Sequence, residues 1–257
     1  MKNIQLIEGD CIEEMENLVN QKVKVDAVIT DLPYGVTDCE WDIPISFKLM
    51  WEKINKLIKD SGAIVLFGVE PFSSKLRLSN IKNFKYDWIW QKNKTSNFAC
   101  AKKQPLRNHE IISIFYKKQC TYNFIKEPRF LSESSKKRMD YAFNTVKGKN
   151  VLQKGLKKVK VVIEDKELSY PKTVQFFKAV ANTDRNRIHP TQKPVALLEY
   201  LMKTYTNEND LVIDFTMGSG STGIACINCK RRFIGIEKNK EIFLKAKNRL
   251  EKHLLRD

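Results

Sequence analysis

Short apolar runs that each end in an acidic residue constrain the fold of this chain more than any other feature. Residues 25–30 read Val-Asp-Ala-Val-Ile-Thr before Asp31, and residues 211–213 read Leu-Val-Ile before Asp214. Such runs are typical of buried strands in a parallel sheet. The carboxyl ends of parallel strands meet at one edge, where α/β proteins bind their ligands. Asp31 and Asp214 are therefore predicted to share one cleft, although 183 positions separate them.

Predicted strands and helices alternate on both sides of a long central stretch. Strands are expected at 3–8, 24–30, 63–67, 211–215 and 232–236, and helices at 12–18, 47–59, 194–204, from 221, and up to 255. Residues 86–92 and 111–117 alternate apolar and polar side chains, which favours an antiparallel strand pair added to the sheet edge. The pattern predicts an α/β fold with a mostly parallel, doubly wound sheet.

The central stretch, 119–188, differs in composition from the rest of the chain. It is rich in Lys, weakly periodic and broken by Gly148, Gly155 and Pro171. It holds sixteen Lys or Arg against seven Asp or Glu, and thus nine of the sixteen net positive charges of the chain. This excess favours a polyanionic partner such as nucleic acid, although a solvated lysine-rich surface explains the charge equally well. We predict that 119–188 is an insertion in the sheet domain.

Hydropathy and cysteine usage argue against a membrane-spanning, a secreted and a zinc-binding protein. No run approaches the ~18 apolar residues of a membrane span, and the N-terminus lacks the apolar core of a signal peptide. A cytoplasmic protein without a membrane partner is therefore expected. Six cysteines are scattered, and the close pair Cys226 and Cys229 has no second pair to complete a zinc site. We expect buried thiols and no bound metal.

A glycine-rich segment follows the strand that ends near Asp214. Residues 218–223 read Gly-Ser-Gly-Ser-Thr-Gly, which fits G-x-G-x-x-G between a strand and a helix, and Glu237 ends the next strand. Such a turn brings backbone close to a ligand, and the carboxylate can accept hydrogen bonds from ribose hydroxyls. A nucleoside-type ligand is predicted. A nicotinamide cofactor and a purely structural turn are the alternatives at this point.

Three motifs together resemble one enzyme family. Asp31-Leu32-Pro33-Tyr34 resembles the D-P-P-Y motif of amino-group DNA methyltransferases, and Asp214-Phe215 with Gly218 and Gly220 resembles their F-x-G-x-G loop. Residues 189–194, His-Pro-Thr-Gln-Lys-Pro, resemble the H-x-x-Q-K-P element of one subgroup. Their order matches the β class of the family. The sequence departs from the pattern at Leu32, where the family usually has Pro.

The resemblance covers nearly the whole chain and implies its organisation. The fold would be the Rossmann-like methyltransferase fold, with 1–118 as its catalytic half and 189–257 as its cofactor-binding half. Residues 119–188 take the place of the target recognition domain. Within that basic segment, the residues expected to contact DNA phosphates are Lys136, Lys137, Arg138, Lys154, Lys157 and Lys158.

The family chemistry is transfer of a methyl group from S-adenosylmethionine to an exocyclic amino group, leaving S-adenosylhomocysteine. The resemblance implies that the Asp31 carboxylate and the Leu32 carbonyl accept hydrogen bonds from that amino group and align its lone pair. Pro33 would stiffen the turn, and Tyr34 would stack on a base flipped out of the duplex. Residues 36–44, which follow directly, are either a loop over that base or a packed connection.

The resemblance also assigns cofactor-binding roles. Asp10 would receive the adenine amino group, and Glu237 the ribose hydroxyls. Asp214 and the loop residues Phe215, Gly218 and Gly220 would hold the methionine end of the cofactor. Thr191 and Lys193 would lie near its carboxylate, because a fixed ammonium binds a carboxylate. Asp10 and Glu237 are equally suited to a role as surface caps.

We therefore expect a site-specific DNA methyltransferase that acts on adenine N6, because Asp rather than Ser at position 31 goes more often with adenine in this family. N4-cytosine methylation, RNA or protein-glutamine methylation, and a catalytically idle DNA-binding module are the alternatives. The expected partner is double-stranded DNA, and the resemblance allows a cognate restriction endonuclease and a homodimer. A prokaryotic or phage origin is expected.

Overall fold

The computed structural model describes residues 3–35, 42–129, 149–151, 159–161, 167–181, 183–184, 187–189 and 191–255. The chain divides into two compact units, one made of Met1–Asn123 with Thr173–Asp257 and the other of Phe124–Lys172. No helix among the described residues is both long and apolar enough to cross a bilayer.

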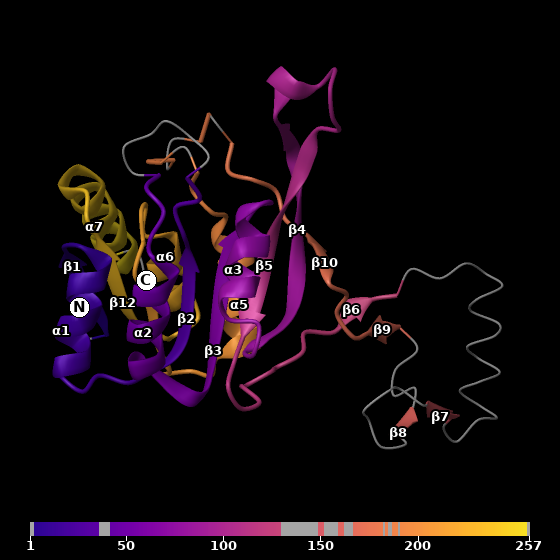
Figure 1. The fold of residues 1–257 in the computed structure, drawn as a ribbon, viewed down its shortest axis with the longest axis horizontal. Coiled ribbons are helices and arrows are strands. Elements are labelled where there is room, and N and C mark those ends of the chain that lie inside the picture. Colours follow the sequence, from indigo (N-terminus) through magenta and orange to yellow (C-terminus); the bar gives the residue numbers. More distant parts are fainter. Residues whose placement is uncertain are drawn as a thin grey trace. The chain divides into compact units, whose positions relative to one another are not determined.

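The larger unit is built on a sheet with the strand order β1-β12-β11-β2-β3-β5-β4-β10 (Figure 1). Its strands are β1 (Ile4–Glu8), β2 (Val25–Asp31), β3 (Ile58–Gly68), β4 (Phe84–Ser96), β5 (Arg107–Phe115), β10 (Val174–Phe176), β11 (Leu211–Asp214) and β12 (Arg232–Glu237). Neighbouring strands are parallel except that β5 is antiparallel to both β3 and β4. The predicted mostly parallel α/β sheet with an antiparallel pair is confirmed.

The end of the sheet differs from the prediction in one respect. The antiparallel pair β4 and β5 is not outermost, because the short strand β10 pairs in parallel with β4 from Ile89 to Gln91. β10 comes from within the 119–188 stretch, and it belongs to the larger unit. The smaller unit, Phe124–Lys172, is thus shorter than the predicted insertion 119–188.

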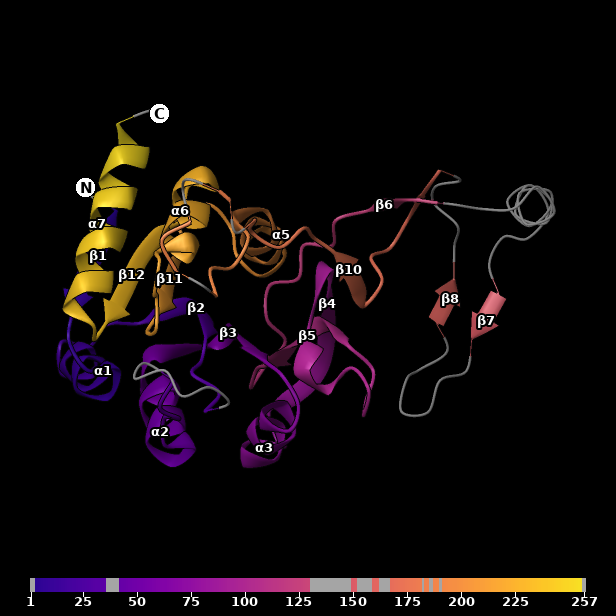
Figure 2. The same ribbon diagram turned by 90° about the horizontal axis from the view of Figure 1, so that it is seen from above.

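Helices cover both faces of the sheet (Figure 2). One face carries α1 (Cys11–Asn20), α2 (Phe47–Leu57) and α3 (Phe72–Ser79), and the other carries α5 (Val195–Tyr205), α6 (Ser221–Asn228) and α7 (Lys240–Leu254). α3 was not predicted, because its eight residues are too few to show a helical period. The two layers bury both faces of the strands, which explains why the strand sequences are almost continuously apolar.

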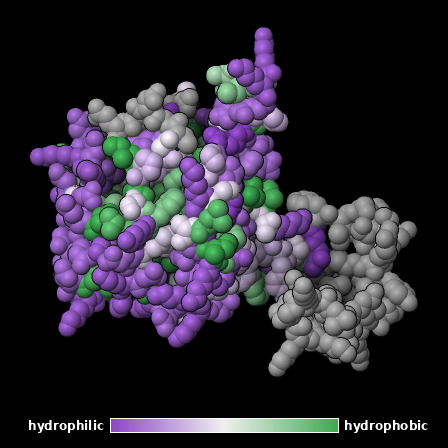
Figure 3. Space-filling model, viewed as in Figure 1, coloured by the Kyte–Doolittle hydropathy of each residue, from purple (hydrophilic) through white to green (hydrophobic). Residues whose placement is uncertain are grey.

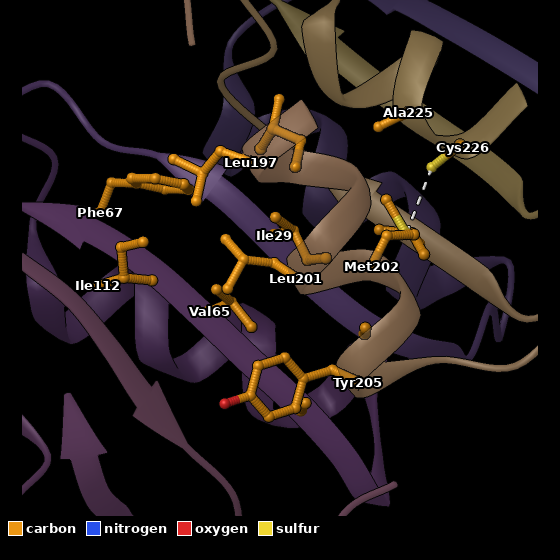
Figure 4. Packing of buried hydrophobic residues seen from close by; sticks show 14 of the residues in the cluster. Ile29, Val65, Phe67, Ile112, Leu197, Leu201, Met202, Tyr205, Ala225 and Cys226 are labelled. Atoms are coloured by element: carbon orange, nitrogen blue, oxygen red, sulfur yellow. Dashed lines mark hydrogen bonds between the residues drawn. The ribbon is translucent and has the colours of Figure 1, made fainter. Parts of the chain in front are cut away.

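The two apolar clusters follow from the alternation of side chains along each strand. In β2, Ile29 points to the α5 side and Val28 to the α1 side, and β3 repeats this with Val65 and Ile64. The visible outer surface of the larger unit is mainly hydrophilic (Figure 3), whereas the residues of the two clusters are buried. Figure 4 shows Leu201 of α5 among strand residues such as Ile29.

The smaller unit holds two short antiparallel ladders. β6 (Glu127–Pro128) pairs with β9 (Leu168–Ser169), and β7 (Lys149–Val151) pairs with β8 (Val159–Val161). The rings of Phe124 and Tyr170 pack edge to face at 4.9 Å. The residues predicted to contact DNA phosphates, Lys136, Lys137, Arg138, Lys154, Lys157 and Lys158, lie outside the described residues.

Hydrogen bonds fix both points where the chain leaves and re-enters the larger unit. Asn123 N donates to Thr204 O at 2.8 Å, and the Asn123 side chain donates to Thr206 O at 3.2 Å. At the other point, Ile89 N donates to Thr173 O at 2.7 Å. The two residues of the larger unit that flank the smaller one, Asn123 and Thr173, are therefore held at the C-terminal end of α5 and at β4.

Candidate active site

The carboxyl ends of β1, β2, β11 and β12 border a cavity of about 580 Å³. It is lined by ten of the residues predicted to form the site: Asp10, Asp31, Leu32, Pro33, Thr191, Lys193, Asp214, Phe215, Gly218 and Glu237. Tyr34 and Gly220 are not among its lining residues. The structure thus brings the two acidic strand ends into one cleft, although they are far apart in the sequence.

Asp31 is the centre of a buried network of charged side chains. Tyr34 donates its hydroxyl proton to Asp31 Oδ1 at 2.5 Å, and the Lys193 ammonium donates to Oδ2. Lys193 Nζ also lies 3.3 Å from Glu110 Oε2, and Lys92 Nζ donates to Glu110 Oε1 at 2.8 Å. Carboxylates and ammoniums alternate along this row, so the two positive charges balance the two negative ones.

Electrostatics favour the charged forms of Lys193 and Glu110, whose side chains are only 8% and 13% exposed. Burial lowers the pKa of Lys193, but the Asp31 and Glu110 carboxylates outweigh it and raise that pKa. Burial also opposes ionisation of Glu110, yet Lys193 and Lys92 hold its pKa below the usual value. For Asp31, burial and the Glu110 charge raise the pKa against the pull of Lys193. Glu110 therefore affects Asp31 in two ways. Its negative charge raises the pKa of Asp31 directly, and its ion pair with Lys193 holds the ammonium beside Asp31.

The turn after Asp31 is fixed by one further carboxylate. Asp42 Oδ1 accepts hydrogen bonds from the backbone N–H of Tyr34 at 2.7 Å and of Gly35 at 2.9 Å. Gly35 has φ +66°, and a Cβ at this position would overlap Pro44. Residues 42–44 are thus packed against the motif, while 36–41 lie outside the described residues.

Tyr34 makes contacts that sequence reasoning did not foresee. Its ring packs on Phe72 of α3, with the ring centroids 5.1 Å apart, and its hydroxyl is engaged by Asp31. Burial and the Asp31 charge raise the pKa of the phenol. The predicted stacking of Tyr34 on a base therefore stays a prediction.

Leu32 packs inward, which gives a physical reason for an apolar residue at this position. Its side chain is 4% exposed and belongs to the apolar cluster under α2 and α3. Leu32 lines the cavity, and no described residue donates a hydrogen bond to its carbonyl oxygen. The backbone acceptor that the family chemistry needs is therefore left available.

Asp214 links the two halves of the sheet at the bottom of the cavity. Its Oδ1 accepts from the Thr30 hydroxyl at 2.6 Å, and its Oδ2 accepts from the Thr222 hydroxyl at 2.6 Å. Thr216 N donates to Oδ1 at 3.2 Å. Burial raises the pKa of Asp214 to about 6, although these donors favour the charged form. The side chain joins β2, the glycine loop and α6.

The glycine loop is held to the end of β12 by Glu237. Glu237 Oε2 accepts from Gly218 N at 3.0 Å, and Oε1 accepts from Asn239 N at 2.8 Å. Burial raises the pKa of this carboxyl group. Gly220 caps α6 with φ +73°, and a Cβ there would lie 3.2 Å from Leu250 of α7. Gly220 thus shapes the turn, while Gly218 borders the cavity.

The remaining predicted cofactor residues also have local partners. Asp10 caps α1 by accepting from Ile12 N at 2.9 Å and forms an ion pair with Lys238 at 3.2 Å. Partial burial opposes ionisation of Asp10, but the Ile12 N–H and Lys238 lower its pKa overall. Thr191 Oγ1 lies 3.0 Å from His189 Nδ1 at the cavity rim. The Lys193 ammonium, predicted near a cofactor carboxylate, contacts Asp31 and Glu110.

Sequence reasoning missed Glu110, Lys92, Thr30 and Thr222. Glu110 belongs to no motif of the sequence, and no role was predicted for it. The available signal was a charge near the amino end of a strand that is otherwise apolar. Its meaning depends on β5 running antiparallel, which brings its amino end to the edge where Asp31 lies.

This fold and this site define a class of enzyme. Residues 25–248 match the family model described as DNA methylase, and the chain therefore belongs to the family of amino DNA methyltransferases.

Similar proteins can be named individually. The Type II methyltransferase M.HpaI of Haemophilus parainfluenzae is 29% identical over 265 residues, which cover 96% of this chain and 74% of that protein. The Type II methyltransferase M.HinfI of Haemophilus influenzae is 24% identical, with 95% and 67% covered. The crystal structure of the M1.HpyAVI–SAM complex matches with a TM-score of 0.65 at 28% identity, covering 96% of this chain and 98% of that one. The cytosine-N4-specific PvuII DNA methyltransferase has a TM-score of 0.65 at 15% identity, with 98% and 90% covered, and shows the shared fold alone.

Proposed function

We propose that this DNA methyltransferase transfers a methyl group from S-adenosylmethionine to N6 of an adenine flipped out of double-stranded DNA. The observation that carries the proposal is the cavity itself. It is bordered on one side by Asp31 and Leu32 and on the other by Gly218 and Glu237. An amino-group acceptor and a nucleoside-binding loop thus face the same space.

The described residues fit the proposed cofactor. Asp10 and Glu237 place carboxylates on the cavity wall, where one can accept from an adenine amino group and the other from ribose hydroxyls. The cavity volume of about 580 Å³ lies in the usual range for sites of small molecules. When bound, the cofactor supplies a methyl group already activated by a sulfonium centre.

The chain's own residues orient the nucleophile. The Asp31 carboxylate and the Leu32 carbonyl accept the two hydrogens of the target amino group, which turns its lone pair toward the methyl donor. Lys193 holds Oδ2, so the amino group approaches Oδ1 and replaces the Tyr34 hydroxyl there. The methyl group would pass to the nitrogen as its bond to sulfur breaks, with S-adenosylhomocysteine as the leaving group, and the Asp31 carboxylate would accept the proton that the nitrogen releases.

The choice of adenine rests on the Asp side chain at position 31, which goes more often with adenine than with cytosine in this family. Residues 119–188 are proposed as the target recognition region, supported by their positive charge. A cognate restriction endonuclease belongs to the same proposal, because the similar proteins M.HpaI and M.HinfI are Type II methyltransferases. A homodimer is proposed only from the resemblance to the family.

A tritiated-methyl assay on unmethylated DNA, followed by nucleoside analysis, tests the proposal. We expect label in N6-methyladenine, and label in N4-methylcytosine would overturn the choice of base. Label on RNA or on a protein glutamine but not on DNA would overturn the substrate class. Asp31→Ala should abolish methylation and retain cofactor binding, and near wild-type transfer by this variant would refute the mechanism.

A further inference from the structure

The β4–β5 hairpin extends past the edge of the sheet on which the cavity opens. Gly68, the last residue of β3, pairs with Ile111 of β5, and Ile111 pairs with Ile89 of β4. Residues 90–96 of β4 therefore continue for seven positions beyond β3, which is roughly 20 Å of extended chain. In Figure 1 this hairpin rises at the top of the view, past the ends of the other strands.

The lower part of the hairpin is rigidly supported. Trp90 Nε1 donates to Phe177 O at 2.9 Å, and Ala179 N donates to Asn93 Oδ1 at 2.8 Å. Lys94 Nζ donates to Val180 O at 3.3 Å. The segment that follows β10 thus braces the ribbon below its tip.

The outer part of the hairpin, residues 92–107, carries charge of a single sign. Between positions 92 and 107 the sequence contains five basic residues and no acidic one. Lys102 and Lys103 at the tip are exposed, and neither has an ion-pair partner in the described part of the chain. Arg107, which pairs with Ser96 just below the tip, partly offsets the rise in the pKa of the Tyr34 phenol, and its Nε is enclosed without a hydrogen-bond partner among described atoms. Positive charge therefore runs from the tip to the catalytic network.

An aromatic side chain lies at the same tip. Phe98 is 67% exposed in the short 3-10 helix η1 (Phe98–Cys100), next to Asn97 with φ +67°. Figure 3 shows the tip as mostly hydrophilic, with a small apolar patch. Protein interfaces are depleted in Lys, whereas nucleic-acid surfaces combine Lys with aromatic faces. A two-stranded ribbon is also narrow enough to enter the major groove of DNA.

We infer that residues 90–107 form a DNA-contacting surface of the larger unit, which binds the duplex beside the cavity. Lys102 and Lys103 bind phosphates, and Phe98 packs its ring against bases. The inference rests on the proposed function, because it requires that the ligand of the cavity belong to DNA. It explains a feature that catalysis alone does not require, namely a braced basic ribbon at the edge of the site.

Binding of a labelled 30-base-pair duplex, measured by fluorescence anisotropy at several salt concentrations, tests the inference. Each lost phosphate contact makes the slope of log K against log salt shallower by about 0.9. Lys102→Ala/Lys103→Ala should therefore flatten the slope by about 2. The matched control is Lys82→Ala/Lys85→Ala, which removes two exposed lysines before and at the amino end of β4 and should leave the slope unchanged.

Phe98→Ala should weaken duplex binding about tenfold, because loss of one stacked base costs roughly 5- to 150-fold in affinity. Phe98→Tyr should restore it, and Ile81→Ala, which truncates a side chain 60% exposed at the opposite edge, should change it less than about twofold. Equal slopes and affinities for the tip variants and the controls would refute the inference. A change in sedimentation of Phe98→Ala with unchanged DNA binding would assign the tip to self-association instead.

The two proposals can fail separately. If the wild type methylates DNA while the tip variants bind and methylate normally, the hairpin inference is wrong and the function stands. If the wild type methylates no DNA while the tip variants lose duplex binding, the proposed function is wrong and the DNA-contacting surface stands.

Discussion

Glu110→Gln is the most informative single substitution in this protein. The Glu110 side chain is 13% exposed and lies between Lys92 at 2.8 Å and Lys193 at 3.3 Å. Removing its charge leaves two buried ammoniums and a single carboxylate, Asp31, so that one positive charge is uncompensated. Breaking a buried pair costs roughly 3 kcal/mol, and we expect a loss of this size in the free energy of unfolding.

The same substitution should slow methyl transfer, because Lys193 loses one of the two anions that position it. A shift of about 1 Å in a positioning group costs on the order of 100-fold in rate. We expect kcat to fall by about this factor, with the cofactor KM changed far less. Glu110 also raises the pKa of Asp31, so its neutralisation should move the acid limb of kcat/KM to lower pH.

Two variants separate positioning from general damage. Lys92→Met combined with Glu110→Gln restores charge balance and should recover much of the lost stability. Glu52→Gln removes an exposed carboxylate that pairs with Lys53 and Lys56, and it should change neither urea unfolding nor kcat. If Glu110→Gln matched Glu52→Gln in unfolding, rate and pH profile, the assignment of Glu110 as a positioning residue would be refuted.

Three further outcomes follow from the site. Because the pKa of Asp214 is raised to about 6, its protonated form favours folding below pH ~3.8, and this contribution is lost as pH rises through 6. The free energy of urea unfolding of the wild type should therefore fall by about 3 kcal/mol relative to Asp214→Asn between pH 3.5 and 7.5. Parallel plots of unfolding free energy against pH for the two proteins would contradict the reasoning. Gly220→Ala should destabilise by about 1–2 kcal/mol, since φ +73° and Leu250 at 3.2 Å both oppose a Cβ; an unchanged melting temperature would count against it. Asp42→Ala removes two hydrogen bonds from the turn after Asp31 and should lower kcat by tenfold or more with cofactor affinity kept, as equilibrium dialysis can check.

The parts of the fold that could be predicted are those in which local pattern and burial coincide. β2, β11 and β12 are apolar because helices cover both of their faces, so short windows of sequence revealed them. The parallel arrangement then placed Asp31 and Asp214 at one edge. α3 escaped prediction because only eight residues form it, and the contact between Tyr34 and Phe72 could not be expected without it.

The charged network could not be predicted for a different reason. Lys193 is 83 positions from Glu110 and 162 from Asp31, and only the placement of β5 between β3 and β4 brings the three together. The motif around Lys193 suggested an anionic partner, but it did not say which. The charged residues of the network are visible in the sequence, but which of them pair depends on the order of the strands in the sheet.

The two tied ends of the 124–172 segment have a consequence for how such proteins diversify. Asn123 and Thr173 are each anchored by hydrogen bonds within the larger unit, and the network of Asp31, Lys193 and Glu110 is assembled entirely from residues outside the segment. A foreign segment spliced between these anchors would inherit a finished catalytic centre. If this segment reads the DNA sequence, as proposed for the 119–188 region, chimeras that exchange only 124–172 between relatives should methylate new DNA sequences at unaltered chemical rates. A chimera inactive on every sequence would show that the segment also builds the centre.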